Sequence, residues 1–168
     1  VGTMTELNDH IKLLFAHHAS LYCPSCGRHV VEHTPQTIWA DLIERLKQIP
    51  NGLESRILIT FDIKVPIELN LETAEAGLSA QGFTRIEQRR SVKDGTILTV
   101  VADRFRVSSV DRGRAIEAIE QALEKGAGTM AVRLKTDDGS SLLAPYTRGF
   151  ICADCKRPFS PPSPSLFS

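Results

Sequence analysis

The chain has 168 residues, enough for one ordinary domain or for two small ones. Hydrophobic residues make up 42% of it, which allows a core and excludes a largely disordered chain. Its 20 basic and 20 acidic residues cancel, so no net charge draws the chain to nucleic acid or to an anionic membrane.

No run approaches the roughly 20 apolar residues that span a bilayer, and the beginning lacks the pattern of a signal peptide. We therefore expect a cytoplasmic protein without a membrane partner. In that reducing setting, paired cysteines hold metal more often than they form disulfides. Because the chain begins at Val1, we also expect it to be a piece of a longer protein.

The first part of the chain reads as two helices around a turn. Apolar residues recur at helical spacing over residues 3–18. A turn-rich segment with Cys23 and Cys26 follows. A second amphipathic pattern covers residues 35–48, and Thr34 before it suits the N-cap position. We assign residues 1–52 to these helices and to the first half of a metal module.

The middle of the chain reads as a small domain of strands and helices. Residues 56–65 alternate apolar and polar side chains, the pattern of a half-buried strand. A helix, a strand, a hairpin turn, a strand, a helix and a strand are predicted next, at 68–80, 83–88, 93–96, 97–107, 111–125 and 129–134. This order predicts an α+β fold, a small mixed sheet with helices, over residues 53–145. Residues 146–168 would hold the second half of the metal module and an extended tail.

The four cysteines carry the clearest chemical signal. Cys23, Cys26, Cys152 and Cys155 form two Cys-x-x-Cys pairs and leave no odd cysteine. Each pair allows two thiolates of one tight turn to hold an ion, and two such turns complete a tetrahedron. Four thiolates leave no open position for water or substrate. The pattern therefore predicts a structural zinc site.

The spacing between the two pairs is unusual. Cys26 and Cys152 are separated by 125 residues, far more than in ordinary zinc sites. Such a gap is acceptable if the intervening chain is an independently folded insertion whose ends lie close together, and zinc would then clamp its neck. Two local disulfides, a redox Cys-x-x-Cys, and replacement of one cysteine ligand by His29 or His33 remain alternatives.

Six segments of the chain follow a recognisable pattern: Val1–Leu7, Leu13–Ala16, Tyr22–Gly27, Val100–Phe105, Ala115–Leu123 and Phe159–Ser168. Together they resemble the UvrA family, the damage-sensing ATPases of bacterial nucleotide excision repair. The resemblance covers nearly the whole chain and is weaker from about residue 53 to 82.

The resemblance implies a non-catalytic fragment of an excision-repair ATPase. It implies that all four cysteines hold zinc, and that the insertion docks the partner protein UvrB. Arg85 and Arg104 stand at positions where the family's arginines contact UvrB. ATP would be bound only by the parent protein, which would also meet damaged DNA and form a homodimer.

The residues themselves also allow a docking surface. From Arg85 to Arg114 there are eight Lys or Arg against four Asp or Glu. A basic patch on a neutral domain suits an acidic protein partner, since charge complementarity steers encounter and arginine reads carboxylates. The alternative is that these are solvated charges at a strand edge, which protect against aggregation.

Two other functions compete with docking. A zinc-containing module that binds DNA directly would use the same basic cluster, but zero net charge and 6% aromatic residues argue against it. A self-contained enzyme would need catalytic residues, and the sequence has neither a Gly-x-x-x-x-Gly-Lys-Ser/Thr loop nor a clear Ser/His/Asp set.

Overall fold

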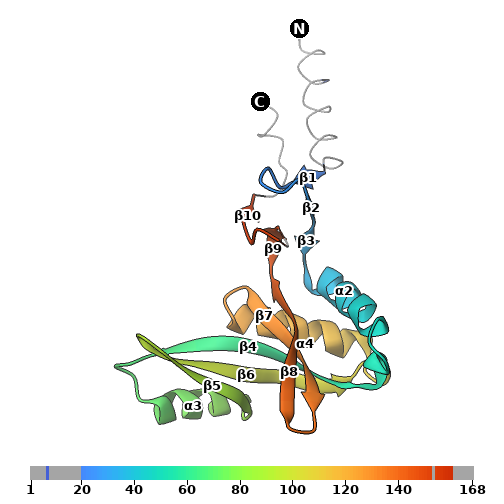
Figure 1. Cartoon of the computed structure of the whole chain (residues 1–168). Helices are drawn as coiled ribbons and strands as arrows, with labels where there is room; N and C mark the ends of the chain where they lie inside the picture. Colours follow the sequence, from blue (N-terminus) through green and yellow to red (C-terminus); the bar gives the residue numbers. More distant parts are fainter. Residues whose placement is uncertain (1–6, 8–19, 153, 161–168) are drawn as a thin grey trace. The chain divides into compact units, whose positions relative to one another are not determined.

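The computed structural model describes residue 7, residues 20–152 and residues 154–160, and divides the chain into two compact units (Figure 1). One unit is discontinuous and holds residues 1–33 and 149–168, whereas the other is continuous from Thr34 to Arg148. In chain order, the second unit is thus inserted into the first. The helix predicted at 3–18 and most of the extended tail lie outside the described residues.

The described part of the discontinuous unit consists of short antiparallel strands and two tight turns. The strands are β1 (Leu21–Tyr22), β2 (His29–Val30), β3 (Glu32–His33), β9 (Gly149–Ile151) and β10 (Pro158–Phe159). β1 pairs with β2, and β9 lies between β10 and β3. Pairing of β3 with β9 joins the two parts of the chain that flank the insertion.

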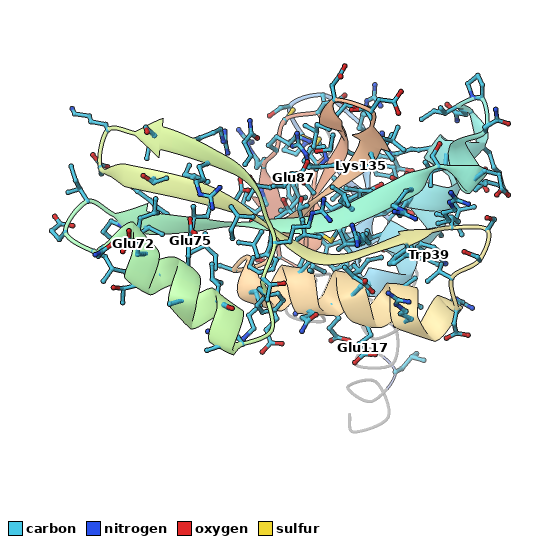
Figure 2. All side chains as sticks on the ribbon, turned by 90° about the horizontal axis from the view of Figure 1, so that it is seen from below. Trp39, Glu72, Glu75, Glu87, Glu117 and Lys135 are labelled. Carbon is cyan, nitrogen blue, oxygen red and sulfur yellow. The ribbon has the colours of Figure 1, made fainter. Side chains whose placement is uncertain are left out.

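The inserted unit is a five-stranded sheet with helices on one face (Figures 1 and 2). Its strands are β4 (Arg56–Pro66), β5 (Ile86–Val92), β6 (Gly95–Arg106), β7 (Thr129–Thr136) and β8 (Gly139–Thr147). Their order is β5-β6-β4-β7-β8. Its helices are α2 (Pro35–Lys47), α3 (Leu71–Ala80) and α4 (Arg112–Lys125), with a 3-10 helix, η1 (Gly52–Glu54). The predicted α+β class is confirmed, although the sheet is antiparallel throughout rather than mixed.

Alternation along the strands directs one apolar row onto the helices. Ile59 and Phe61 of β4 are buried in one core with Ile119 and Leu123 of α4. Phe83, which precedes β5, meets the ring of Phe61 edge-on at a centroid distance of 5.2 Å. Burial of such side chains contributes roughly 1.5–3 kcal/mol each, so this core supplies most of the stability of the inserted unit.

Helix α2 belongs to the inserted unit. Its Trp39, labelled in Figure 2, packs edge-on against Phe105 of β6, with ring centroids 6.3 Å apart. The hydroxyl of Tyr146 in β8 donates a hydrogen bond of 2.7 Å to Asp41. Sequence patterns placed the domain boundaries after residues 52 and 145, whereas the units divide after His33 and Arg148. The difference arises because α2 buries its apolar stripe in the core of the insertion.

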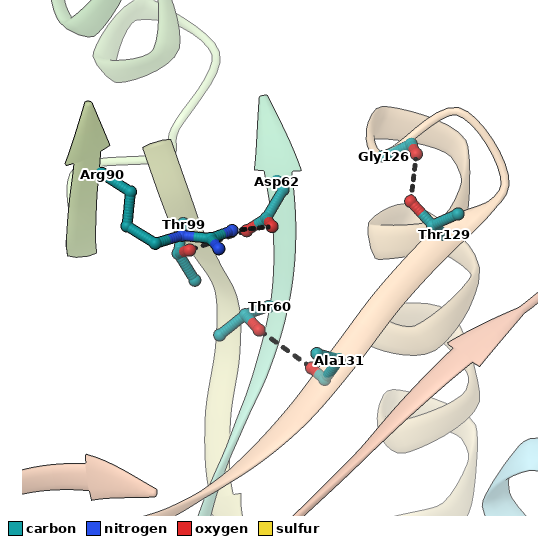
Figure 3. A network of polar contacts seen from close by, with 7 residues as sticks. All are labelled: Thr60, Asp62, Arg90, Thr99, Gly126, Thr129 and Ala131. Atoms are coloured by element: carbon teal, nitrogen blue, oxygen red, sulfur yellow. Dashed lines mark hydrogen bonds and ion pairs between the residues drawn. The ribbon is translucent and has the colours of Figure 1, made fainter. Parts of the chain in front are cut away.

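The face of the sheet that points away from the helices is polar and fully bonded at its centre (Figure 3). The buried hydroxyl of Thr60 donates to the carbonyl oxygen of Ala131 at 2.9 Å. Thr99 donates to Asp62 at 2.6 Å, and Arg90 pairs with the same carboxylate at 3.1 Å. Buried hydroxyls are tolerated when they are satisfied in this way.

The β7–β8 hairpin curls over this polar face. Ser140 of β8 donates to Glu87 of β5 at 2.6 Å, although β5 and β8 are the two outer strands of the sheet. Arg133 of β7 donates to the same serine hydroxyl at 2.8 Å. Figure 2 shows Glu87 beside the end of the hairpin that carries Lys135. Within the described part of the chain, no helix has the length and apolar character needed to cross a membrane.

Candidate metal centre and docking arginines

Four thiols meet in the discontinuous unit. The Sγ atoms of Cys23, Cys26, Cys152 and Cys155 all lie within 4.8 Å of one another. None of them forms a disulfide, and the Sγ atoms of Cys26 and Cys152 are 3.5 Å apart. In each pair the first cysteine is buried and the second is exposed. The structure thus brings together all four residues that the spacing predicts as ligands.

The two turns that present these thiols are built alike. In each, the residue after the second cysteine donates its N–H to the carbonyl of the first, at 2.7 Å from Gly27 to Cys23 and 3.0 Å from Lys156 to Cys152. Both donors adopt left-handed conformations, with φ of 72° for Gly27 and 55° for Lys156. Glycine accepts this conformation without strain, whereas a lysine there costs about 1 kcal/mol. The same hydrogen bond and left-handed residue therefore occur in the second turn, where lysine stands in place of glycine.

Hydrogen bonding and burial separate the pKa values of these thiols. Burial raises the pKa of Cys23, but hydrogen bonds from the backbone of Cys26 and Ser25 outweigh it and lower the pKa to about 6. Hydrogen bonding with the thiols of Cys26 and Cys23 raises the pKa of Cys155 to about 12. Charge on one sulfur thus opposes charge on the next. A bound divalent cation would remove this conflict by neutralising the thiolates together.

The donor set fits zinc. Four sulfurs at about 2.3 Å from Zn²⁺ in a tetrahedron lie about 3.8 Å apart, which agrees with sulfur atoms gathered within 4.8 Å. Among the described residues, His29 and His33 do not belong to this cluster. His29 instead packs against Tyr22, with ring centroids 5.3 Å apart. Asp154 and Arg28 form an ion pair that links the two turns.

The two arginines predicted to dock a partner lie in strand β6 and in the segment that pairs with it. Arg104 is an exposed residue of β6, and Arg85 is a half-buried residue just before β5. The carbonyl oxygen of Arg85 accepts the N–H of Val101 at 3.0 Å, which ties the two segments together. Neither arginine forms an ion pair with another described residue, so both guanidinium groups remain available.

Other arginines of the basic segment are not available in the same way. Within residues 85–114, three of them are paired with acids, as Arg89–Glu75, Arg90–Asp62 and Arg114–Asp103. Because hydrogen bonds from Arg89 stabilise the carboxylate, the pKa of Glu75 is lowered. The count of basic residues in the sequence therefore overstates the free positive charge of this surface.

One arginine near β6 was missed in the sequence. Arg56 opens β4 and stands opposite Arg106 in the β4–β6 register. With Arg104 and Arg114 they line a hollow of about 440 Å³. Arg56 lies almost 50 positions from Arg104 in the chain, and only knowledge of the strand pairing would have placed it in this cluster.

Comparison with known proteins gives a consistent set of relatives. No protein-family model matches the chain. The chain is 30% identical to UvrABC system protein A of Vibrio cholerae, 29% identical to that of Helicobacter pylori and 28% identical to that of Haemophilus ducreyi. Each alignment covers 100% of this chain and 18% of the relative. The chain thus spans less than one fifth of the length of these relatives.

Proposed function

We propose that this chain, a homologue of one segment of UvrABC system protein A, is a non-catalytic module of a nucleotide excision repair protein. In this proposal it holds a structural zinc ion and docks UvrB, the partner implied by its resemblance to the UvrA family. The clustering of four thiols within 4.8 Å, from both sides of an inserted unit, carries the proposal. ATP and damaged DNA would be bound by other parts of the parent protein.

The zinc ion would have an architectural role. Cys23 and Cys26 precede the inserted unit in the chain, and Cys152 and Cys155 follow it. An ion held by all four ties the chain before the insertion to the chain after it. Structural zinc contributes on the order of 10 kcal/mol to folding.

Metal analysis of the purified chain tests this role. We expect about one zinc per chain, and loss of that zinc in the double variant Cys152→Ser with Cys155→Ser. Ser25→Ala is the matched control, because Ser25 lies in the same type of turn but supplies no sulfur. A metal content unchanged by the double variant would contradict the assignment.

The docking role would belong to the inserted unit. Arg85 and Arg104 keep their guanidinium groups out of ion pairs with described residues. Arginine binds carboxylates through two parallel hydrogen bonds, which gives both strength and orientation. Because the whole chain is neutral, a partner would be attracted by this local surface rather than by bulk charge.

Binding of purified UvrB tests the docking role. We expect Arg104→Glu and Arg85→Glu each to weaken binding about tenfold or more, because reversal replaces an attraction by a repulsion. Lys93→Glu is the matched control, since Lys93 is exposed at the tip of the β5–β6 hairpin and makes the same change in net charge. Unchanged binding by both arginine variants, or equal weakening by the control, would refute the assignment.

A further inference from the structure

Strand β6 has an open edge where β5 ends. β5 pairs with β6 only as far as Val100, and β6 continues to Arg106 (Figure 1). One more hydrogen bond, from the N–H of Val101 to the carbonyl of Arg85, closes that ladder. No other described segment pairs with residues 102–106 on this side of the strand. An exposed strand edge is a template for an added strand.

The hydrogen bonds of neighbouring residues show which backbone groups of β6 point to this open edge. The N–H of Val101 faces it, because it bonds to the chain before β5. After a bulge in the β4–β6 ladder, the N–H of Arg104 faces it too, since it donates to the Asp103 carboxylate at 2.7 Å. Alternate residues of a strand direct their polar groups to the same side, so Arg106 faces the edge as well.

Two of these backbone groups are left for a partner. The carbonyl of Arg106 accepts the N–H of Val110 at 3.0 Å within the following turn. Among the described residues, no hydrogen bond is made by the carbonyl of Arg104 or by the N–H of Arg106 on the open side. A segment laid antiparallel to β6 would meet one acceptor and one donor two residues apart.

Positive charge surrounds this edge. Arg104 and Arg106 lie two positions apart on the face of the sheet away from the helices, and Arg56 stands opposite Arg106. From the helix side, Arg114 of α4 lies over the ring of Phe105, 5.9 Å from its centroid. The four arginines share the hollow of about 440 Å³ described above.

We propose that this edge binds an extended acidic segment of a protein partner as an additional antiparallel strand. Side chains of an added strand opposite Arg104 and Arg106 would be acidic, since opposite charges across a ladder attract. The side chain between them would turn to the helix side, toward Phe105 and the half-buried Val110, and would be apolar. The occupant is therefore a segment of alternating acidic and apolar residues. The inference rests on the docking proposal, because Arg104 serves both.

Asp103 places a carboxylate beside this edge in the isolated chain. Its side chain accepts the N–H of Arg104 at 2.7 Å and two hydrogen bonds from Arg114, both at 2.9 Å. Its negative charge opposes the approach of an acidic segment. Such an inward charge also keeps an open edge from pairing with other copies of the chain.

Fluorescence anisotropy with a labelled peptide of alternating glutamate and valine tests the proposal. When glutamates lie opposite Arg104 and Arg106, their N–H groups face β6, while those of the valines point away. N-methylation of the glutamates should weaken binding about tenfold, because it removes the N–H that would donate to the carbonyl of Arg104. N-methylation of the same number of valines is the matched control and should change affinity by less than about threefold.

Two protein variants extend the test. Arg106→Glu should abolish peptide binding, and Asp103→Asn should tighten it about threefold by removing a negative charge beside the edge. Asp94→Asn controls for net charge, because Asp94 pairs with Lys64 at the far end of the sheet. Equal affinities of the two methylated peptides would overturn strand addition, as would equal competition by a DNA duplex at the same salt concentration. If UvrB binding still depends on Arg104 in that case, only this inference fails and the docking proposal stands.

Discussion

Removal of the metal should unfold the discontinuous unit and leave the inserted unit folded. The described core of the discontinuous unit contains three buried residues, Cys23, Val30 and Cys152, of which two are proposed metal ligands. Burial of a valine contributes about 1.5–3 kcal/mol, whereas ordering each residue of the backbone costs roughly 1–2 kcal/mol. Partly buried Leu21, Phe150 and Phe159 add only part of such a gain each. Without the ion, the cost of ordering the backbone should therefore exceed the gain in the described part of this unit.

The inserted unit has no such dependence. Its core is a separate cluster in which Ile57, Phe61, Leu98, Ile119 and Leu123 are almost completely buried. None of the four cysteines belongs to this cluster. Chelation should therefore leave its cooperative unfolding transition in place.

Amide hydrogen exchange in the presence of a zinc chelator measures both units at once. The N–H groups of Gly27 and Lys156 report on the two metal turns, and that of Gly126, bonded to Ala122 at 2.8 Å, reports on the inserted unit. We expect the first two to lose protection and the third to keep it, with recovery when zinc is returned. Continued protection of Gly27, or loss at Gly126 at the same chelator concentration, would refute the reasoning.

Four further substitutions probe local features. In a denaturant titration, Gly126→Ala should destabilise the inserted unit by about 2 kcal/mol or more, because its Cβ would lie 2.0 Å from the carbonyl oxygen of Thr129. Gly77→Ala lies in open space on α3 and should instead stabilise the unit by about 0.5–1 kcal/mol. Lys156→Gly should stabilise the zinc-bound discontinuous unit by about 1 kcal/mol, measured by its resistance to chelation. Arg89→Ala should return the lowered pKa of Glu75 to its ordinary value near 4.5 in an NMR titration. Since that pKa is lowered by folding, the stabilisation is present above the ordinary pKa and lost as the pH falls through the lowered one.

Local patterns predicted most elements of the inserted unit because their signals lie within the element. Helix α4 was expected at 111–125 and spans Arg112–Lys125, with Asp111 as an N-cap that accepts the N–H of Gly113 at 2.9 Å. β5 was expected at 83–88 but spans Ile86–Val92. Its polar half is held by contacts with other elements, such as the ion pair of Arg89 with α3, and a local pattern cannot show these.

The metal cluster was predictable for a different reason. Two close pairs of cysteines signal a shared ion at any separation in the chain, provided that the ends of the insertion meet. The arginine surface was only partly predictable. Alternation along a strand predicts which face a side chain lies on, but not which residue of another strand lies beside it. The position of Glu87 illustrates this limit: strict alternation would put it on the same strand face as Arg85, but the β5–β6 ladder has a bulge between Ile86 and Gln88.

Ion pairs within the chain determine how much positive charge is left to attract an acidic partner. Arg89, Arg90 and Arg114 are each bonded to an acid, so their charge is largely cancelled at short range. Arg104 and Arg106 have no such partner among the described residues and stand two positions apart on one strand. With few free charges, salt should weaken binding only modestly, in contrast to the steep dependence of proteins that contact many phosphates. A partner of this surface would therefore be selected by the spacing of its acidic residues and by its extended backbone.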